Sequence, residues 1–369
     1  ATNPVNITID TFAPIVTGVV NNGIYSEDVM PTFNEGFATL NGVSFSNGTI
    51  LVAEGNYTLI VTDIAGNSTT IKFVISKTTI WENGQWNNGS PDVTKKAILR
   101  ASYPANITAK SLRFEADVVV PKGVVYDILE EVNNTTHQVV FEHGAYLIQR
   151  NDLLKNNAII SFKRKSKPVY RLETMDWSSP VFGQNILALS PNTLQNRFYR
   201  YDEKTNAWVN NIKSPDLFSG GEYIAFRAPN DFNDYGNGPS RVFEGTFTGI
   251  PINGLFIKPA FKSNFGNNAI GNPYPSPIDL SRFVNINQPL NISKVFVWTH
   301  SKPIVNGEFN GNNWAVYNPT LGWDDPSITS NILDVGQGFI VQIQNQGLIM
   351  FNNSIRVAPS GNTPIISYK

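Results

Sequence analysis

The chain has 369 residues, of which 41% are hydrophobic and 15% are charged, and its formal net charge is −1. This length predicts roughly two to four domains, and the small, balanced charge excludes the basic surface that binding to nucleic acid or anionic lipid requires. Cysteine is absent, which excludes disulfides, thiolate metal sites and cysteine nucleophiles.

The composition is typical of an extracellular β-protein, because Asn, Thr, Ser and Gly are abundant while Lys and Glu are few. No stretch approaches the roughly 18 consecutive apolar residues of a membrane-spanning helix, so we expect no direct membrane insertion. The chain begins ATNPVNITID, without an initiator Met, a basic region or an apolar region. We therefore expect a mature or excised segment of an extracellular protein.

Residues 1–77 predict a first domain of immunoglobulin size. From Tyr57 to Ile75, in YTLIVTDIAGNSTTIKFVI, apolar and polar residues alternate on both sides of a turn, which predicts a β-hairpin. Short apolar runs upstream supply the other strands of a sandwich. The stretches DTFAPIVTGVVNNGIYSEDV and EGNYTLIVTDIAGN resemble the bacterial Ig-like repeats of large surface adhesins. This resemblance implies a spacer or presenting domain.

Residues 78–155 predict a β-solenoid-like segment. Between Ile98 and Ile148, short apolar runs recur at loosely regular intervals and are separated by turns. This spacing suits the rungs of a small solenoid, in which each turn stacks on its neighbour. A compact sandwich is the alternative.

The remaining residues contain an internal duplication. DWSSPVFG around Trp177 matches NPYPSPIDL around Tyr274 at an offset of 97 residues, and FYRY matches VFVW at the same offset. Further on, GGEYIAF matches GQGFIVQ, with Tyr223 on Phe339. Because Trp177 and Trp298 each match an aromatic residue of the other copy, we expect both in the core.

The duplication predicts two β-sandwich units of jelly-roll-like character. We expect a first copy at 156–229, a linker at 230–242, and a second copy at 243–369 with an insertion at about 302–331. The segment GNPYPSPID, 271–279, has three prolines in five positions, which excludes a helix or a central strand. We interpret it as a rigid corner before the next strand, with Tyr274 packed inward.

The same region resembles a block found in large secreted and cell-surface proteins of Bacteroidota. The motifs that carry the resemblance are SFKRKSKPVYRLETMDWSSPV, GNPYPSPID, VFVWTH, GQGFIV and FNNSIR, within residues 80–357. In such proteins the block often precedes a type IX secretion sorting domain. The resemblance implies export through the type IX secretion machinery and an extracellular location, and it assigns no catalytic residue. After Arg356 the sequence shows no sorting domain, which leaves the anchoring mode open.

Motifs for catalysis are scarce. Histidine occurs only at His137, His143 and His300, and the sequence contains no HExxH, GxSxG, P-loop or GxGxxG motif. Adjacent carboxylates such as Glu130 and Glu131 do not assign the acid and the nucleophile of a glycosidase. We therefore predict a non-enzymatic protein, with glycoside hydrolysis as the alternative reaction.

The stretch DFNDYGN, at 231–237, gathers several oxygen donors around one glycine. Calcium takes about six to eight oxygen ligands, so Asp231, Asn233, Asp234 and Asn237 are candidate calcium ligands. The stretch lacks the closing Glu of an EF-hand loop, and an Asx-rich turn that binds its own backbone is the alternative. Calcium is the one cofactor that the sequence suggests.

Aromatic residues gather in the second copy. Trp314, Tyr317 and Trp323 lie near Asp324 and Asp325, and these five are the candidate ligand-binding residues. Sugar-binding sites combine an aromatic platform with amide and carboxylate partners, and insertions on a duplicated scaffold often carry binding. The expected partner is a surface glycan or another extracellular ligand. Core packing is the alternative for Trp314 and Trp323.

Together these patterns predict an all-β, non-enzymatic segment of a secreted bacterial cell-surface protein that acts in adhesion or surface presentation. One alternative is a carbohydrate-binding module of a secreted polysaccharide-active enzyme. Another is a structural subunit or stalk of a surface filament. In the adhesion hypothesis, weak contacts gain strength from many copies.

Overall fold

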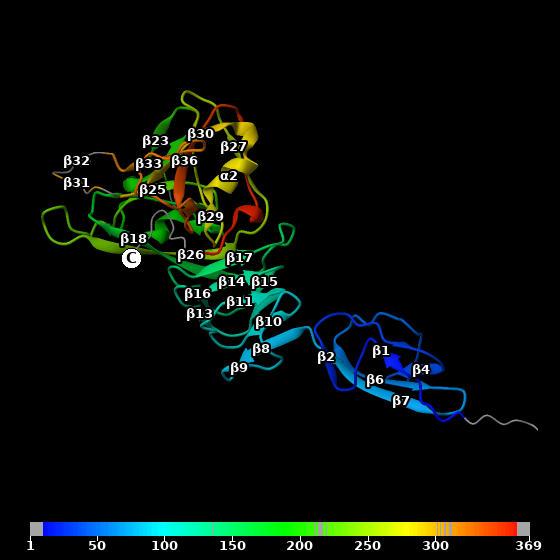
Figure 1. The fold of residues 1–369 in the computed structure, drawn as a ribbon. Coiled ribbons are helices and arrows are strands. Elements are labelled where there is room, and N and C mark those ends of the chain that lie inside the picture. Colours follow the sequence, from blue (N-terminus) through cyan, green and yellow to red (C-terminus); the bar gives the residue numbers. More distant parts are fainter. Residues whose placement is uncertain are drawn as a thin grey trace, which may run out of the picture. The chain divides into compact units, whose positions relative to one another are not determined.

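The computed structural model describes residues 10–134, 136–210, 212, 217–218, 220–300, 302, 304–305, 308–309 and 312–359 (Figure 1). Within these residues nearly all regular structure is β-strand, and the longest helix, α2 (Leu280–Ile286), has seven residues. The predicted all-β fold class is confirmed. The chain divides into two compact units, Ala1–Ile98 and Leu99–Lys369.

The first unit contains a five-stranded sheet in the order β2-β7-β6-β4-β5 and the two-stranded pair β1-β3. These strands are β1 (Val16–Thr17), β2 (Gly23–Tyr25), β3 (Thr32–Phe33), β4 (Phe37–Leu40), β5 (Val43–Phe45), β6 (Gly55–Thr62) and β7 (Ser68–Ile75). The predicted hairpin is formed by β6 and β7, and the Asp63 carboxylate fixes its turn by accepting from the Asn67 N–H at 2.8 Å. Alternate residues such as Leu59 and Val61 are fully buried and form the core face.

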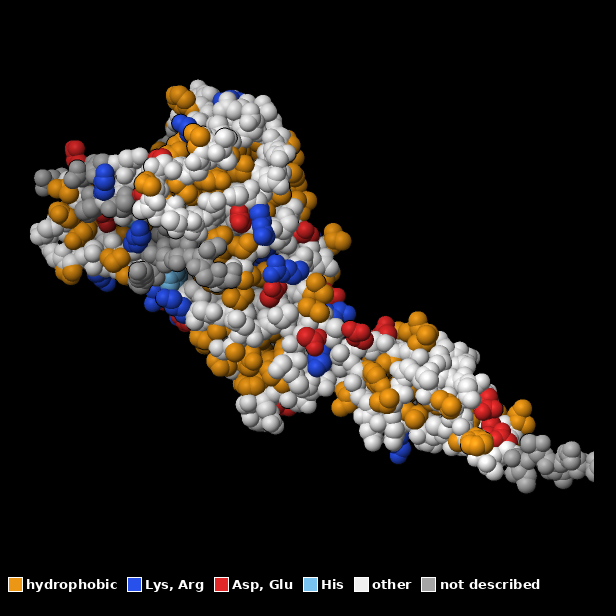
Figure 2. All heavy atoms as spheres, in the orientation of Figure 1, with side chains coloured by type: hydrophobic (Ala, Val, Ile, Leu, Met, Phe, Trp, Pro, Cys, Tyr) orange, Lys and Arg blue, Asp and Glu red, His pale blue; other side chains and the backbone are white. Residues whose placement is uncertain are grey.

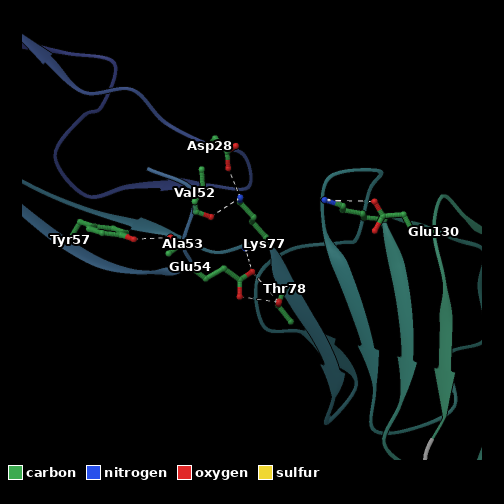
Figure 3. A network of polar contacts seen from close by, with 9 residues as sticks. Asp28, Val52, Ala53, Glu54, Tyr57, Lys77, Thr78 and Glu130 are labelled. Carbon is green, nitrogen blue, oxygen red and sulfur yellow. Dashed lines mark hydrogen bonds and ion pairs between the residues drawn. The ribbon is translucent and has the colours of Figure 1, made fainter. Parts of the chain in front are cut away.

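A network of polar contacts fixes the chain just after this hairpin (Figure 3). The Lys77 ammonium binds the Asp28 carboxylate and donates to the Val52 carbonyl at 2.9 Å. The Lys77 N–H and the Thr78 hydroxyl both donate to Glu54 Oε1, at 2.6 and 3.0 Å. One lysine and one glutamate therefore hold the exit of the Ig-sized sheet in place.

The first compact unit continues beyond this point. β8 (Thr78–Glu82) pairs antiparallel with β9 (Gln85–Trp86), and the Trp81 and Trp86 rings lie 5.5 Å apart. The unit ends within β10 (Lys96–Leu99), past the boundary at residue 77 that the sequence predicts for the Ig-like domain.

The second unit begins with the predicted β-solenoid. Its strands are β11 (Ile107–Ala109), β12 (Ser111–Phe114), β13 (Val118–Val120), β14 (Val125–Ile128), β15 (Val132–Asn134), β16 (Val139–Phe141) and β17 (Tyr146–Gln149). They form parallel ladders, β11-β14-β17, β12-β15 and β13-β16. Val118 and Val120 point inward and are at most 1% exposed, whereas Val119 between them is 47% exposed. The compact-sandwich alternative is therefore wrong for this segment.

β18 (Ile160–Val169) connects the solenoid to the duplicated region. It pairs parallel with β16 and antiparallel with β26 (Arg241–Pro251), which in turn pairs with β20 (Val181–Phe182). One sheet thus runs from the solenoid into the duplicated region. Residues 241 and 242, at the end of the predicted linker, are part of β26.

The two sequence repeats share one order of elements. The first copy contains β19 (Thr174–Trp177), β21 (Gln184–Asn185), α1 (Ile186–Leu189), η1 (Gln195–Arg197), β22 (Phe198–Asp202), β23 (Ala207–Val209), β24 (Leu217–Phe218) and β25 (Ile224–Arg227). The second contains β28 (Asn267–Gly271), β29 (Ile278–Asp279), α2, η2 (Gln288–Leu290), β30 (Ile292–Trp298), β33 (Trp314–Asn318), β34 (Gly322–Trp323), β35 (Ile332–Leu333) and β36 (Gly338–Ile343). Their sheets are ordered β19-β25-β22-β23 and β28-β36-β30-β33-β34.

Local details repeat as well. A two-residue strand precedes each helix and pairs with the later two-residue strand of its copy, β21 with β24 and β29 with β35. Each helix has a side-chain N-cap, Asn185 in α1 and Asp279 in α2, which accepts a backbone N–H and satisfies a donor that the helix leaves free. Outside this common set, β34 pairs with β33 in the second copy, β31 (Ile304–Val305) pairs with β32 (Glu308–Phe309), and β27 (Phe256–Ala260) pairs with β37 (Gly347–Phe351).

The strand register corrects two details of the predicted repeat. Phe198 pairs with Phe226 in the first copy, and Val295, its match at the offset of 97, pairs with Val341 in the second. The return strands therefore align with Ile224 on Phe339, and the predicted match of Tyr223 with Phe339 is wrong by one residue. Because Trp177 pairs with Ile224 and Ile270 pairs with Phe339, Trp177 aligns with Ile270, and its predicted match with Tyr274 is also wrong. A slip of one residue in a strand exchanges its two faces, which short sequence matches do not detect.

The GNPYPSPID segment forms a buried corner against the solenoid. Tyr274 is fully buried, and its hydroxyl donates to the Gly254 carbonyl at 2.6 Å. The Asn272 side chain closes the corner by donating to the Ser276 carbonyl at 2.8 Å. On the solenoid side, the Leu147 N–H donates to the Pro275 carbonyl at 2.9 Å.

Arg356, directly after η3 (Asn353–Ile355), is buried beneath this corner at 1% exposure. Its Nη2 donates to the Leu147 carbonyl at 2.6 Å and its Nε to Ser276 Oγ at 2.8 Å. Nη1 reaches the side-chain oxygens of Asn253 and Asn353, both at 3.1 Å. The guanidinium also lies over the Tyr274 ring, 4.8 Å from its centroid. A single side chain thus joins four separate segments.

Replacing Arg356 by Met is expected to lower the free energy of unfolding by about 3 kcal/mol, because the Leu147 carbonyl and the Ser276 hydroxyl lose their charged donor in a buried site. Urea denaturation of the whole chain measures the change. Arg282→Met is the control, since Arg282 is exposed and makes one bond of 3.3 Å to the Ser354 carbonyl. Equal stability of the two variants would contradict this role.

Candidate functional site

Two equivalent hairpins carry aromatic pairs on their outer faces. In the first copy Tyr201 on β22 lies opposite Trp208 on β23, and in the second copy Trp298 on β30 lies opposite Trp314 on β33. The ring centroids are 5.1 Å apart in both pairs. Large aromatic side chains opposite one another stabilise strand pairing, which accounts for their place at these positions.

Strand alternation separates these aromatic residues from the core. Phe198 points inward and is fully buried, while Tyr199 on the opposite face is partly exposed. In the second copy Val295 is fully buried and Phe296 is partly exposed. The outer face of each sheet therefore presents aromatic rings that are partly exposed. Four of them also pack against a small buried cluster of Tyr223, Ala225, Ala269 and Ile340, namely Tyr199, Tyr201, Phe296 and Trp314.

The two copies meet at the ends of their edge strands, β19 and β28. The Ser178 N–H donates to the Gly336 carbonyl at 2.8 Å, and the Gly271 N–H donates to the Gly221 carbonyl at 3.3 Å. A Cβ on Gly271 would lie 2.1 Å from the Cβ of Ser178, so only glycine permits this close approach. Because the edges join, the aromatic faces of the two sheets adjoin.

Two hollows lie on these adjoining faces. One has a volume of about 470 Å³ and is lined by Thr174, Asp176, Tyr199, Trp208, Ala225, Arg227, Trp298, Asn312, Asn313 and Trp314. The other has a volume of about 400 Å³ and is lined by Tyr201, Asn206, Trp208, Asn267, Phe296, Asn312, Trp314, Val316 and Ile340. Trp208 and Trp314 line both, so we describe the two hollows together as the aromatic cleft.

A short motif, Asn-x-Trp, occurs in both hairpins. Asn206 precedes Trp208, and Asn312 precedes Trp314. Asn206 adopts a left-handed backbone with φ of 57°, as its turn requires, and its side-chain oxygen accepts the Tyr201 hydroxyl. The Asn312 side-chain oxygen accepts the Trp314 N–H at 3.0 Å. Each tryptophan is therefore placed by a turn that also brings an amide to the cleft.

Charged groups lie in the first hollow. Asp176 on β19 is 6% exposed, and burial raises the pKa of its carboxyl to about 7, while the Tyr223 hydroxyl and the Arg164 guanidinium act in the opposite direction. Arg227 on β25 donates to the Leu172 carbonyl. Among the described residues, no carboxylate forms an ion pair with Arg227.

The structure places the five predicted ligand-binding residues apart. Trp314 lines the cleft, whereas Tyr317 is in the core at 7% exposure. Trp323 packs against that core, with its ring 5.1 Å from Tyr317. Asp324 accepts the Val316 N–H at 2.7 Å, and Asp325 accepts the Ser327 N–H at 2.9 Å, so both carboxylates hold the backbone. Parts of the predicted insertion lie outside the described residues.

Trp298 was assigned to the core by its match with Tyr201, and this assignment is wrong. Both residues are partly exposed and line the cleft, Trp298 in the first hollow and Tyr201 in the second. Trp177, in contrast, is 2% exposed and packs as expected. A match between copies indicates a shared position, and that position can be on either face of a strand.

The predicted calcium ligands are engaged with other groups. Asp234 forms a bidentate ion pair with Arg171, at 2.7 and 2.9 Å, and this pair lowers the pKa of the Asp234 carboxyl. Asp231 lies 3.2 Å from the Arg241 guanidinium. The Asn233 side chain donates to the Pro239 carbonyl, and the Asn237 N–H closes a turn onto Asp234. The arrangement is that of an Asx-rich turn paired with arginines. Among the described residues, no group of three or more His, Asp and Glu side chains is placed to hold a metal ion.

Residues 77–366 match a family described as a domain of unknown function, DUF8693. The chain belongs to this family. Comparison with curated proteins and with solved structures gives no match. The DUF8693 region includes the solenoid and both copies of the duplication, and it therefore contains the whole aromatic cleft.

The surface of the protein gives few other indications. Acidic and basic side chains are interspersed on the face shown in Figure 2, as the balanced composition predicts. In the part of the chain that the structure describes, no helix is long and apolar enough to cross a membrane. The aromatic cleft is thus the feature of the DUF8693 region that most clearly suggests a ligand.

Sequence reasoning missed most of the residues that line the cleft. The predicted binding residues do not include Tyr199, Tyr201 or Trp208, although the sequence contains a signal for them. The Asn-x-Trp motif recurs after each matched strand, FYRY and VFVW, and each of these strands carries aromatic residues two apart. Aromatic residues two apart on a strand share a face, so a repeated pair of them indicates an exposed aromatic surface.

Asp176→Asn is expected to change how stability depends on pH. Because the pKa of the folded carboxyl is raised, its contribution to stability is complete below about pH 4 and is lost as the pH rises to about 7. As the pH rises from about 4 to about 7, the unfolding free energy of the variant should therefore increase relative to that of the wild type by on the order of 3 kcal/mol. Above about pH 7 the difference should stay constant. Urea denaturation across this pH range measures the difference.

Asp325→Asn is the matched control for Asp176. Its exposed carboxyl has a pKa lowered by the hydrogen bond from the Ser327 hydroxyl, so it stabilises the fold above its unfolded pKa and loses that effect only in acid. The control should therefore show no change between pH 5 and pH 7. A constant difference between wild type and Asp176→Asn across the range would disprove the assignment of the raised pKa.

Millimolar calcium is expected to leave the melting temperature unchanged, and chelation with EDTA should likewise have no effect, because Arg171 and Arg241 already neutralise the two carboxylates. Differential scanning fluorimetry with calcium, magnesium and EDTA measures this. A rise in melting temperature with calcium, lost in Asp234→Asn, would show that the cation displaces the arginine and would support the calcium hypothesis.

Proposed function

We propose that the DUF8693 region is a non-enzymatic glycan-binding domain, and that this chain acts in adhesion or presentation at a bacterial cell surface. The observation that carries the proposal is the aromatic cleft, in which Trp208 and Trp314 line both hollows. The two tryptophans come from different copies of the duplication, so the cleft depends on the folded pair.

The chemistry of the cleft fits a saccharide better than other ligands. A sugar ring has an apolar face that stacks on an aromatic ring and hydroxyl groups that need hydrogen-bond partners. The cleft supplies both, because the tryptophans lie beside the amides of Asn206, Asn267 and Asn312. The volumes of about 470 and 400 Å³ lie within the range of small-ligand sites. The near-neutral composition does not favour a nucleic acid.

Binding is favoured over hydrolysis by the number of carboxylates. Glycoside hydrolysis usually requires two carboxyl groups on opposite sides of the scissile bond. Among the described residues that line the two hollows, Asp176 is the single carboxylate. The pKa of about 7 would suit a general acid, but a partner for it is needed and the lining provides none among those residues.

The cell-surface role rests on the sequence resemblance to secreted proteins of Bacteroidota and on the modular architecture. In this proposal the Ig-sized sheet acts as a spacer, and the solenoid holds the glycan-binding copies on a rigid support. Export through the type IX secretion machinery is part of the same proposal. Repetition of such a chain on a surface would strengthen individually weak contacts.

Trp208→Ala and Trp314→Ala are each expected to weaken glycan binding by about 30-fold, which corresponds to about 2 kcal/mol for a central aromatic contact. A panel of immobilised glycans identifies a ligand, and calorimetry with the wild type and both variants measures the affinity. Phe265→Ala is the matched control, because Phe265 is an aromatic residue with 65% exposure that does not line the cleft. Absence of binding across the panel, or equal loss in the control, would overturn the proposal.

A further inference from the structure

The two hollows of the aromatic cleft occupy equivalent positions in the two copies. The floor of the first includes Tyr199 and Ala225, and the floor of the second includes Phe296 and Ile340. These residues correspond through the strand register, since Tyr199 pairs with Ala225 and Phe296 pairs with Ile340. The cleft is therefore a tandem of two subsites that the duplication created, with Trp208 and Trp314 between them.

The subsites differ in charge. Thr174 on β19 lines the first subsite, and Asn267 occupies the equivalent position on β28 in the second. Each residue pairs with a residue near the end of the return strand of its own copy, which is β25 in the first and β36 in the second. Their partners are Arg227 in the first copy and Gln342 in the second. Arg227 lines the first subsite, whereas the described residues that line the second carry no charge, and this difference predicts different ligand groups for the two subsites.

Arg227 is the group that points to the class of ligand. Its guanidinium donates to the Leu172 carbonyl, but among the described residues no carboxylate pairs with it. An arginine in a ligand-sized hollow with unused donors is suited to bind a carboxylate or sulfate. Asp176, in the same hollow, is 6% exposed, and burial raises the pKa of its carboxyl to about 7, which reduces its repulsion of an anion at or below neutral pH.

We propose that the aromatic cleft binds an oligosaccharide in which acidic and neutral sugar residues alternate, with an acidic residue on Arg227 in the first subsite and a neutral residue over Phe296 in the second. This inference rests on the proposed glycan-binding function and specifies its ligand class. The shared tryptophans stack the residues at the junction, so at least two adjacent sugar residues are needed for full affinity.

The test uses the whole chain and three tetrasaccharides. The first alternates glucuronic acid with N-acetylglucosamine, the second is its carboxyl methyl ester, and the third is chitotetraose, which is neutral throughout. The wild type is expected to bind the acidic tetrasaccharide about tenfold more tightly than either neutral one, by calorimetry at low salt. The preference for the acidic tetrasaccharide over the neutral ones should decrease as ionic strength rises.

Arg227→Gln should lower the affinity for the acidic tetrasaccharide to that for the methyl ester and so abolish the preference, while Arg227→Lys should retain part of the preference. Tyr199→Ala and Phe296→Ala are a matched pair, one in each subsite, and each should reduce binding of the tetrasaccharide to that of a disaccharide. Thermal melting of each variant confirms that it is folded.

The possible outcomes separate the two proposals. If all three tetrasaccharides bind equally and Arg227→Gln has no effect, the acidic subsite is disproved while glycan binding stands. If a disaccharide binds as tightly as a tetrasaccharide, the tandem arrangement is disproved. If none of these saccharides and no glycan of the wider panel binds, the proposed function fails, and this inference fails with it.

Discussion

The buried guanidinium of Arg356 is the interaction on which the second unit depends. A charge removed from water must have its donors satisfied, and Arg356 achieves this with the Leu147 carbonyl of the solenoid, the Ser276 hydroxyl of the proline corner and two asparagine side chains. Each partner lies on a different segment. The geometry of the guanidinium therefore fixes how the solenoid, the corner and the segment around Arg356 pack.

The corner in turn determines how the two copies meet. Gly271, at its start, approaches Ser178 so closely that a side chain is excluded, and this contact aligns the edges of the two sheets. Alignment of the edges brings the outer faces together, and the aromatic rings of both hairpins then form one cleft. The two duplicated sheets therefore form one ligand-sized surface together, and the polar residues that line its two hollows differ.

Several parts of this architecture could be predicted from local patterns. Short apolar runs with turns between them indicate the solenoid, because this pattern depends only on neighbouring residues along the chain. The offset of 97 residues indicates the repeat, because a repeat is found by comparing two segments of the sequence directly. The cleft could not be found in this way. The repeat match predicts a core position for Trp298, and the sequence leaves both binding and core packing open for Trp323. In the structure Trp298 lines the cleft and Trp323 packs against the core, since a strand has two faces and sequence alone does not state which one the protein covers.

Alternation, turn residues and proline geometry act over a few residues, so the all-β class, the stacked rungs, the duplication and the proline corner could be predicted from the amino-acid sequence. The packing of distant segments determines which aromatic residues are exposed and which acidic residues pair with arginines, and it brings Trp208 and Trp314 to one ligand-sized cleft. These outcomes depend on contacts between segments up to about two hundred residues apart, such as that of Arg356 with Leu147, and local patterns carry no information about them.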